Sequence, residues 1–156
     1  MLKSKFNIDC QLDLIGIGNS LKYLQELSRE LKIENQVNFL GLKDRTYIYN
    51  NLCNYHLFVQ PSRYEGFGLT VVEAMAAKIP VLVSNIDGPI EIIKNGDFGY
   101  SFESENPDDL ADEIANIYYS YGNQIMINRI NLAFNYAKEN FDVAKTADEY
   151  INSYKY

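Results

Sequence analysis

The sequence is poor in the residue types that most often hold metal ions or form disulfide frameworks. Its 156 residues include one histidine, His56, and two cysteines, Cys10 and Cys53, and they include no tryptophan. The cysteines lie far apart and form no Cys-x-x-Cys pair, so we interpret them as reduced thiols of a cytoplasmic protein. A lone histidine without a partner pattern leaves a catalytic triad without a candidate. We therefore expect neither a metal ion nor a cofactor.

Long hydrophobic runs are also missing. No apolar run approaches the ~20 residues that a membrane-spanning helix needs, and residues 1–10 lack the apolar stretch of a secretory signal. Basic residues are few, because 14 Lys and Arg stand against 21 Asp and Glu and give a net charge of −7. That sign argues against a nucleic-acid-binding surface over the whole chain.

Strand-length apolar runs alternate with stretches of helical period along the first part of the chain. The expected strands are residues 12–17, 37–40, 55–60, 80–84 and 99–102. The expected helices between them are residues 19–33, 44–54, 69–78 and 89–94. Asn19 or Ser20 is expected to cap the first of these helices. The alternation is typical of βαβ units, so it predicts an α/β fold with a doubly wound parallel sheet.

Helical period alone remains toward the C-terminus. Asn106 can cap the first of these helices, and Pro107 stands at its first helical position. A second helix is expected over residues 124–140, and a third begins at Phe141.

The whole pattern predicts one Rossmann-like domain. It covers residues 1–156, with a strand and helix part over about 11–102 and a helical part over about 107–156. Because ligands of such sheets bind beyond the carboxyl ends of the strands, the loops there are where chemistry is expected. Those loops are residues 16–20, 41–43, 61–68 and 84–89.

Gly16 and Gly18 stand where a strand gives way to a helix. Glycines at such a turn let a backbone approach a phosphate at the helix N-terminus. The third glycine of a dinucleotide-binding fingerprint is replaced by Leu21. A tight turn without a ligand therefore stays open as the alternative.

The loop after the third expected strand carries more information. Pro61 ends the strand, and Gly66 and Gly68 leave backbone amides that no side chain covers. The helix that begins after Gly68 turns free N–H groups and the positive end of its dipole toward the ligand edge of the sheet. This arrangement predicts a cradle for a diphosphate.

Two carboxylates flank that cradle, Glu65 in the loop and Glu73 on the helix. Carboxylates accept hydrogen bonds from hydroxyl groups and repel phosphates, so the pair suits a ligand with a diphosphate between two polyols. A nucleotide sugar has that outline. The alternative is that both are acids that the helix dipole stabilises, by ~0.3–1 kcal/mol each.

The segment from Pro61 to Glu73 resembles the Glu-x7-Glu signature of retaining glycosyltransferases of the GT-B fold, family 4. The likeness continues in residues 16–18, 37–41, 78–84 and 87–99, and in Phe141-Asp142 with Tyr154. The chain resembles the C-terminal, donor-binding half of that fold, with its C-terminal helices. The resemblance implies transfer of a sugar, without a metal ion, from a nucleoside-diphosphate sugar to an acceptor hydroxyl in polysaccharide or glycoconjugate synthesis.

The resemblance also implies roles for individual residues. Glu65 would contact the donor sugar and be the catalytic residue, and Glu73 would bind the ribose hydroxyls. The diphosphate would lie on the amides of Gly66, Phe67, Gly68 and Leu69. Gly41 and Leu42 would lie near the base of the nucleotide, and Gly16 would line the cleft.

A complete GT-B enzyme has a second, N-terminal acceptor domain that this chain does not resemble. The family's Gly-Arg…Lys segment, whose cations neutralise the leaving diphosphate, has no counterpart here either. We therefore expect the chain alone to have negligible transferase activity and to need an acceptor domain or subunit. A non-catalytic nucleotide or nucleotide-sugar binding module, or an inactive truncated remnant, stays open as the alternative. Self-association and association of the full enzyme with a membrane surface also stay open.

Three details of the resemblance can be checked in a structure. The absent segment carries the family's first strand, so its neighbours could close up, another chain could supply it, or the sheet could have a gap. Lys78 replaces a usual glycine, where we expect only a changed helix end. Arg63 is the nearest replacement cation, and we interpret it as a surface pairing partner.

Overall fold

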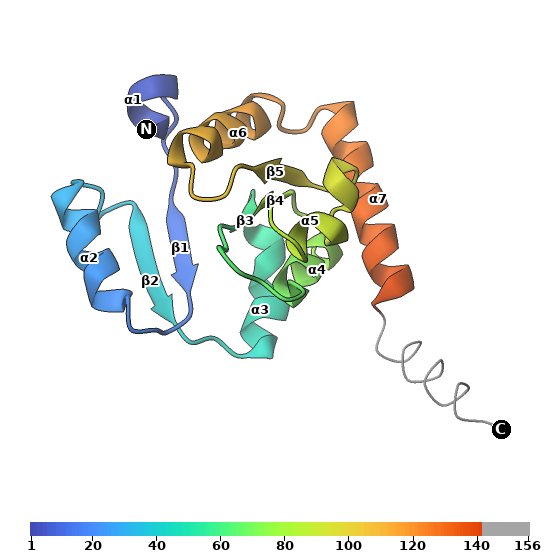
Figure 1. The fold of residues 1–156 in the computed structure, drawn as a ribbon, viewed down its shortest axis with the longest axis horizontal. Coiled ribbons are helices and arrows are strands. Elements are labelled where there is room, and N and C mark those ends of the chain that lie inside the picture. The colour runs from blue at the N-terminus through green and yellow to red at the C-terminus, as the bar shows by residue number, and fades with distance from the viewer. Residues whose placement is uncertain (142–156) are drawn as a thin grey trace. The chain divides into compact units, whose positions relative to one another are not determined.

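The computed structural model describes residues 1–141 of the chain (Figure 1). The likeness noted at Asp142 and Tyr154, and the predicted third C-terminal helix beyond Phe141, lie outside the described residues. The chain divides into two compact units, Met1–Asn51 and Leu52–Tyr156.

The first unit is a small α/β element with a two-stranded parallel sheet. Its elements are α1 (Leu2–Phe6), β1 (Leu12–Ile15), α2 (Leu21–Glu30), β2 (Val37–Gly41) and α3 (Arg45–Asn51). Strand β1 pairs with β2, with Leu12 opposite Val37. At the carboxyl end of the pair the N–H of Gly16 donates to the carbonyl of Gly41 at 2.8 Å. The two glycines therefore stand side by side at the edge where ligands of parallel sheets bind.

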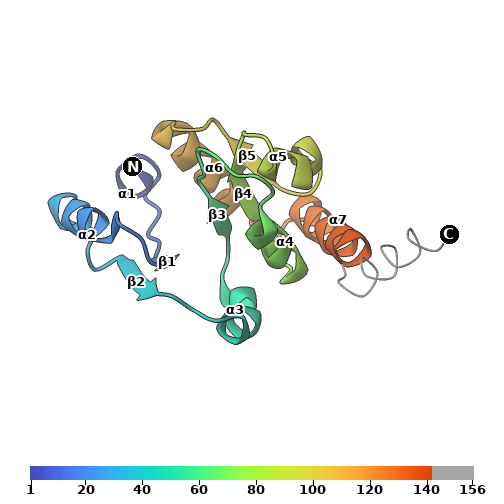
Figure 2. The same cartoon turned by 60° about the horizontal axis from the view of Figure 1, so that its bottom comes forward.

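The second unit is built on a three-stranded parallel sheet with the order β3-β4-β5 (Figure 2). Its elements are η1 (Leu52–Asn54), β3 (Phe58–Gln60), α4 (Leu69–Ala76), β4 (Val81–Ser84), α5 (Pro89–Ile92), η2 (Lys94–Gly96), β5 (Tyr100–Phe102), α6 (Pro107–Tyr119) and α7 (Gln124–Asn140). The central strand β4 is buried along its whole length. A continuous buried strand is typical of a parallel sheet that helices cover on both faces.

The hydrophobic core of the second unit joins its sheet to the C-terminal helices. Leu82 of β4 and Phe102 of β5 pack with Ile117 of α6 and Met126 of α7. Helix α7 also lies against α4 in both views. The core therefore holds α4, the helix that begins at the glycine-rich loop, against the rest of the unit.

All strand pairs are parallel, which confirms the predicted α/β fold class. The strands form two separate sheets.

Several predicted element ends are wrong, each for a local reason. The first strand stops at Ile15 because Gly16, at φ 137°, leaves the strand conformation. The third strand starts only at Phe58, because Leu52–Asn54 form a 3-10 turn that the N–H of Tyr55 closes onto Leu52.

Of the two predicted helix caps, one is confirmed and one is wrong. Asn106 caps α6 as predicted, since its side chain accepts from the N–H groups of Asp108 and Asp109. The predicted side-chain cap of α2 is wrong. Ser20 has φ −82° and ψ −3°, already near-helical values, and makes no capping hydrogen bond.

The end of α4 explains the unusual Lys78. Lys78 has φ 58°, and its N–H donates to the carbonyl of Met75 at 3.1 Å. A residue in this left-handed conformation ends helices, and glycine is the usual choice. Its ammonium nitrogen lies 4.3 Å from the centroid of the Phe134 ring on α7. The substitution therefore changes the helix end and adds a contact between α4 and α7.

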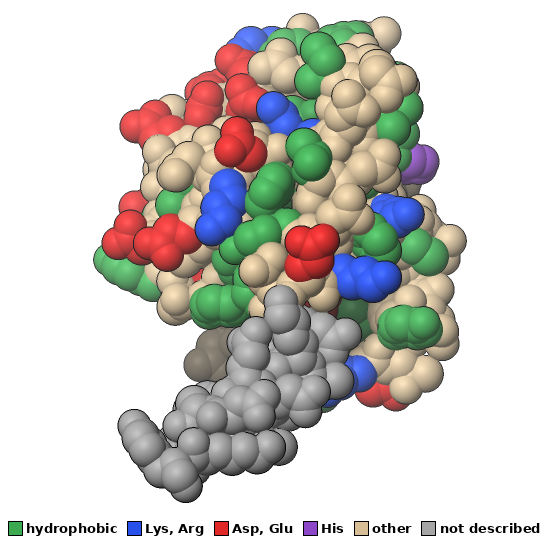
Figure 3. Space-filling model, turned by 90° about the vertical axis from the view of Figure 1, so that its right-hand side faces the viewer, with side chains coloured by type: hydrophobic (Ala, Val, Ile, Leu, Met, Phe, Trp, Pro, Cys, Tyr) green, Lys and Arg blue, Asp and Glu red, His purple; other side chains and the backbone are tan. Residues whose placement is uncertain are grey.

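Surface charge is mixed rather than basic. On the face in Figure 3, acidic side chains gather near one border and Lys and Arg are dispersed among hydrophobic groups. Such a face lacks the continuous basic stripe that a nucleic-acid backbone needs. Among the described residues no helix is both long and apolar enough to cross a membrane.

Gly99, at the start of the third strand of the second unit, should not tolerate a side chain. A Cβ there would lie 2.6 Å from Cγ2 of Val81 and 2.8 Å from Cγ2 of Ile93, both in the core. Gly99→Ala should therefore lower the free energy of unfolding by about 1–3 kcal/mol, as overpacking does. Urea unfolding measures it, with Gly66→Ala as the control, since a Cβ at Gly66 meets nothing within 4 Å. Equal stability of the two variants would contradict the tight packing at Gly99.

Candidate functional site

The amide loop, residues 65–69, joins β3 to α4 at the carboxyl edge of the sheet. Its anchor is Gln60, the buried last residue of β3. The side-chain amide of Gln60 donates to Oε2 of Glu65 at 3.0 Å, and its carbonyl oxygen accepts from the hydroxyl of Thr70 at 2.8 Å. Gln60 thus ties the start of the loop to the first turn of α4.

Glu65 is held at both carboxylate oxygens. Besides the bond from Gln60 to Oε2, the N–H of Phe67 lies 3.4 Å from Oε1. The side chain is half-buried. Two donors on one carboxylate fix its orientation, while each oxygen keeps a lone pair that can accept a ligand hydroxyl.

The N-terminus of α4 leaves backbone donors open. Gly68 caps the helix in a left-handed conformation, at φ 92°, and the N–H of Val71 donates back to its carbonyl at 2.9 Å. Within the described part of the chain, the N–H groups of Leu69 and Thr70 have no acceptor. They stand at the positive end of the helix dipole, where an anion is stabilised.

The turn after β4 packs against the backbone of the amide loop. Gly88, at φ 85°, lies so close that a Cβ there would be 2.9 Å from the carbonyl oxygen of Glu65 and 3.2 Å from that of Gly66. At the end of β4 the hydroxyl of Ser84 donates to the carbonyl of Ser62 at 2.6 Å. The close approach of Gly88 therefore limits where the backbone of Glu65 and Gly66 can lie.

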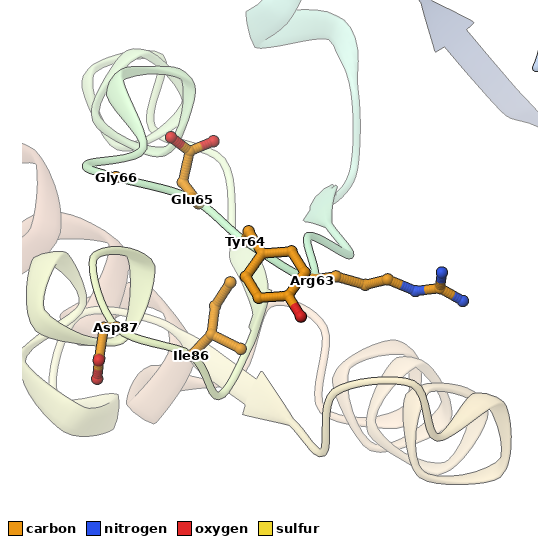
Figure 4. A pocket seen from close by; sticks show the side chains of 6 residues that line it. All are labelled: Arg63, Tyr64, Glu65, Gly66, Ile86 and Asp87. Atoms are coloured by element: carbon orange, nitrogen blue, oxygen red, sulfur yellow. The ribbon is translucent and has the colours of Figure 1, made fainter. Parts of the chain in front are cut away.

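A pocket of about 670 Å³ lies beside the amide loop (Figure 4). Pockets for small ligands commonly enclose ~300–1,000 Å³. The six residues that line it are Arg63, Tyr64, Glu65, Gly66, Ile86 and Asp87. Arg63 points away from Glu65 in Figure 4, and its Nε forms an ion pair with Glu105 at 2.8 Å. It is therefore a pairing partner at the surface, as its sequence position suggested.

The other residues proposed from the sequence lie in three places. Glu73 is exposed on α4, about one turn beyond the open amides of Leu69 and Thr70. Gly66, Phe67 and Leu69 are exposed in the amide loop, and Gly68 is buried at its end. Gly16, Gly41 and Leu42 belong to the first unit, where Leu42 is 74% exposed. The structure thus brings together the Glu65 to Glu73 set within one unit.

Sequence reasoning missed Gln60 and Thr70. A polar residue at the last position of a buried strand is unusual, and that signal could have drawn attention to Gln60. No group of three or more His, Cys, Asp or Glu side chains that could hold a metal ion is found among residues 1–141.

The parallel α/β architecture, with an open helix N-terminus at the carboxyl edge of the sheet, defines the chain as a Rossmann-like domain of the GT-B type. Residues 1–128 match the family described as Glycosyl transferases group 1, and the chain belongs to this family. The resemblance seen in the sequence is thereby confirmed at the level of family and fold.

Three similar proteins make the likeness concrete. An uncharacterized glycosyltransferase of Methanocaldococcus jannaschii is 32% identical over 147 residues, which are 94% of this chain and 37% of that protein. A glycosyltransferase of Rickettsia africae superposes with a TM-score of 0.88 at 24% identity, covering 99% of this chain and 41% of that one. HepE of Anabaena, in complex with UDP-glucose, gives a TM-score of 0.80 at 26% identity, with 92% and 41% covered. The chain thus spans well under half the length of these proteins.

Proposed function

We propose that this chain is the donor-binding domain of a retaining glycosyltransferase and holds a nucleoside-diphosphate sugar along the amide loop. The observation that carries the proposal is the pair of open N–H groups at the start of α4, with a carboxylate on either side. The UDP-glucose bound to HepE, at 26% identity, supports a nucleotide sugar as the ligand class.

The diphosphate would lie over the backbone amides of Gly66, Phe67, Gly68 and Leu69, of which the Phe67 amide also reaches Oε1 of Glu65 at 3.4 Å. The glycines on either side of Phe67 carry no Cβ, and at Gly66 that space is open to at least 4 Å. Phosphate oxygens can therefore approach the backbone closely, at the positive end of the helix dipole.

The two carboxylates would receive the polyols at the ends of the ligand. Glu65, fixed by Gln60, accepts from hydroxyl groups of the donor sugar, and Glu73 accepts from the ribose. Glu73 lies five residues after Gly68, ~7 Å along a helix that rises 1.5 Å per residue. The contacts expected of Gly16, Gly41 and Leu42, which belong to the first unit, stay a prediction.

In the transfer step the bond between the anomeric carbon and the diphosphate oxygen breaks, and the acceptor hydroxyl oxygen bonds to that carbon with retained configuration. The hydroxyl proton passes to the departing diphosphate. Negative charge then develops on the leaving diphosphate. Amides and a helix dipole that already point at this charge stabilise it without reorganisation, which is often the largest contribution to catalysis. An acceptor domain would bind the molecule that carries this hydroxyl, so we propose that this chain alone has negligible turnover.

One observation favours the alternative of a binding module without catalysis. Arg63 is the only cation among the residues that line the pocket, and it is paired with Glu105. A leaving diphosphate usually needs cationic charge as well as amides. Mixing the chain with an acceptor domain of the family and assaying sugar transfer separates the two functions, since a pure binding module stays inactive.

Calorimetric titration of the chain tests donor binding itself. UDP or GDP should bind at least about tenfold more tightly than the matching monophosphate, because the second phosphate adds charge-assisted hydrogen bonds. The nucleoside without phosphate should bind weakest. Equal affinity for diphosphate and monophosphate would refute a diphosphate cradle at α4.

A further inference from the structure

Phe67 is the residue whose side chain can hold the middle of the amide loop, because Gly66 and Gly68 on either side of it have no side chains. Glu65, at the start of the loop, is held by Gln60. The ring of Phe67 is 47% exposed and makes one aromatic contact among the described residues. That contact is an edge-to-face pair with Phe141, with centroids 5.7 Å apart and planes at 69°.

Phe141 is itself held firmly, although it stands at the last turn of α7. It is the C-cap residue, and its N–H donates to the carbonyl of Ala137 at 3.0 Å. Its ring meets Tyr136 edge-to-face at 5.6 Å, and Tyr136 packs on Phe98 at 4.8 Å. The ammonium of Lys94 lies 5.0 Å from the centroid of Tyr136.

These four side chains, Phe98, Tyr136, Phe141 and Phe67, form an aromatic row that runs from the turn before β5 to the amide loop. The helix that carries two of them packs against α4, and its buried Ala133 and Ala137 allow the close approach. The amide loop is therefore held at two places within the unit: Gln60 holds its start, and the aromatic row holds its middle.

We propose that Phe141 is a positioning residue for the diphosphate cradle: its ring holds Phe67 so that the amides of the loop are already ordered before a ligand arrives. The inference rests on the proposed function. It goes beyond the proposed function because Phe141 acts through Phe67, a residue that lies 74 positions before it in the chain.

Phe141→Ala should weaken the binding of UDP or GDP by about tenfold, because a loop freed by loss of the ring must be ordered when the ligand binds. Affinity for the corresponding nucleoside should not change, since the nucleoside does not use the loop amides. Phe141→Tyr keeps the ring and should restore diphosphate affinity. A ligand-specific loss with rescue by an aromatic residue is not expected from a general loss of stability.

Phe134→Ala is the matched control. Phe134 is a half-buried phenylalanine of the same helix, and its ring contacts Lys78 rather than the loop. Its removal should lower stability to a similar degree and leave diphosphate affinity within about twofold of wild type. In a Phe67→Ala background, Phe141→Ala should have no further effect on affinity, because the contact through which it acts is already gone.

Two results would overturn the inference: wild-type diphosphate affinity in Phe141→Ala, or an equal loss for diphosphate and nucleoside. If the wild-type chain binds neither UDP nor GDP, the proposed function fails. The effect of Phe141 on the order of the amide loop is then measured by NMR relaxation. Backbone order parameters of Phe67 and Leu69 should then fall from about 0.85 to below about 0.6 in Phe141→Ala and stay high in Phe134→Ala. Unchanged order parameters in Phe141→Ala would reject the positioning role independently of any ligand.

Discussion

Gly88→Ala is expected to lower the free energy of unfolding by about 2–5 kcal/mol and to abolish tight diphosphate binding. At φ 85° an L-residue is strained by about 1–2 kcal/mol. The new Cβ would also lie 2.9 Å from the carbonyl oxygen of Glu65 and 3.2 Å from that of Gly66, which adds about 1–3 kcal/mol of overpacking. Both neighbours are backbone atoms, so no flexible side chain can move aside, and the amide loop itself must shift.

Urea unfolding and calorimetry on the same samples check both parts of this expectation. Gly66→Ala is the control for stability, because a Cβ at that position meets nothing within 4 Å, and its unfolding free energy should change by less than about 0.5 kcal/mol. A Gly88→Ala protein that unfolds at the wild-type midpoint would show that the turn after β4 does not support the loop. Reduced stability with wild-type diphosphate affinity would instead show that the loop absorbs the shift without disturbing its amides.

The framework of the fold is readable from the sequence because it rests on local regularities. Strand β4 is a continuous apolar run, and α6 begins at an asparagine cap followed by proline, so both were predicted nearly in place. Where a turn or a tertiary contact determines the end of an element, the prediction from the sequence is wrong. Ser20 adopts near-helical angles instead of capping, and Gly16 leaves the strand two residues early to pair with Gly41.

Some residues of the candidate site were predicted from the sequence and others were missed. The glycines and the two glutamates were found because their spacing is carried by one continuous loop and helix. Gln60 was missed because its role comes from two side-chain bonds that exist only once Glu65 and Thr70 fold over it. Phe141 was noted as a helix start and as part of a family likeness, and its positioning role was missed, since its contact with Phe67 joins the end of α7 to a loop far back in the chain.

Lys78 shows what resemblance adds to pattern. Helical period carried the helix through residue 78, whereas the structure ends α4 at Ala76. The comparison with the family's glycine pointed to an altered helix end, and Lys78 does stand at a positive φ of 58°. Composition alone holds no such signal, because lysine seldom takes the left-handed conformation.

Glu73→Gln is expected to weaken nucleoside-diphosphate binding by about 10–100-fold, since a hydrogen bond to a charged group contributes about 1.5–3 kcal/mol. Glu73 is exposed on α4, so its replacement should leave folding unchanged. The matched control is Glu113→Gln on α6, which removes the same charge from a carboxylate whose partner is the side-chain amide of Asn116. That variant should bind as the wild type does.

A change in the ligand separates ribose recognition from any general effect of charge. If Glu73 accepts from ribose, the wild-type chain should prefer UDP or GDP over the 2′-deoxy or 3′-deoxy diphosphate, and Glu73→Gln should lose most of that preference. Removing a negative charge by itself would strengthen the binding of all these anions equally, so the sign of the change distinguishes the two causes. A Glu73→Gln protein that binds every diphosphate more tightly would show that Glu73 is a surface carboxylate that does not bind ribose. Glu65 would then be the one carboxylate of the pair that accepts a hydrogen bond from a ligand hydroxyl.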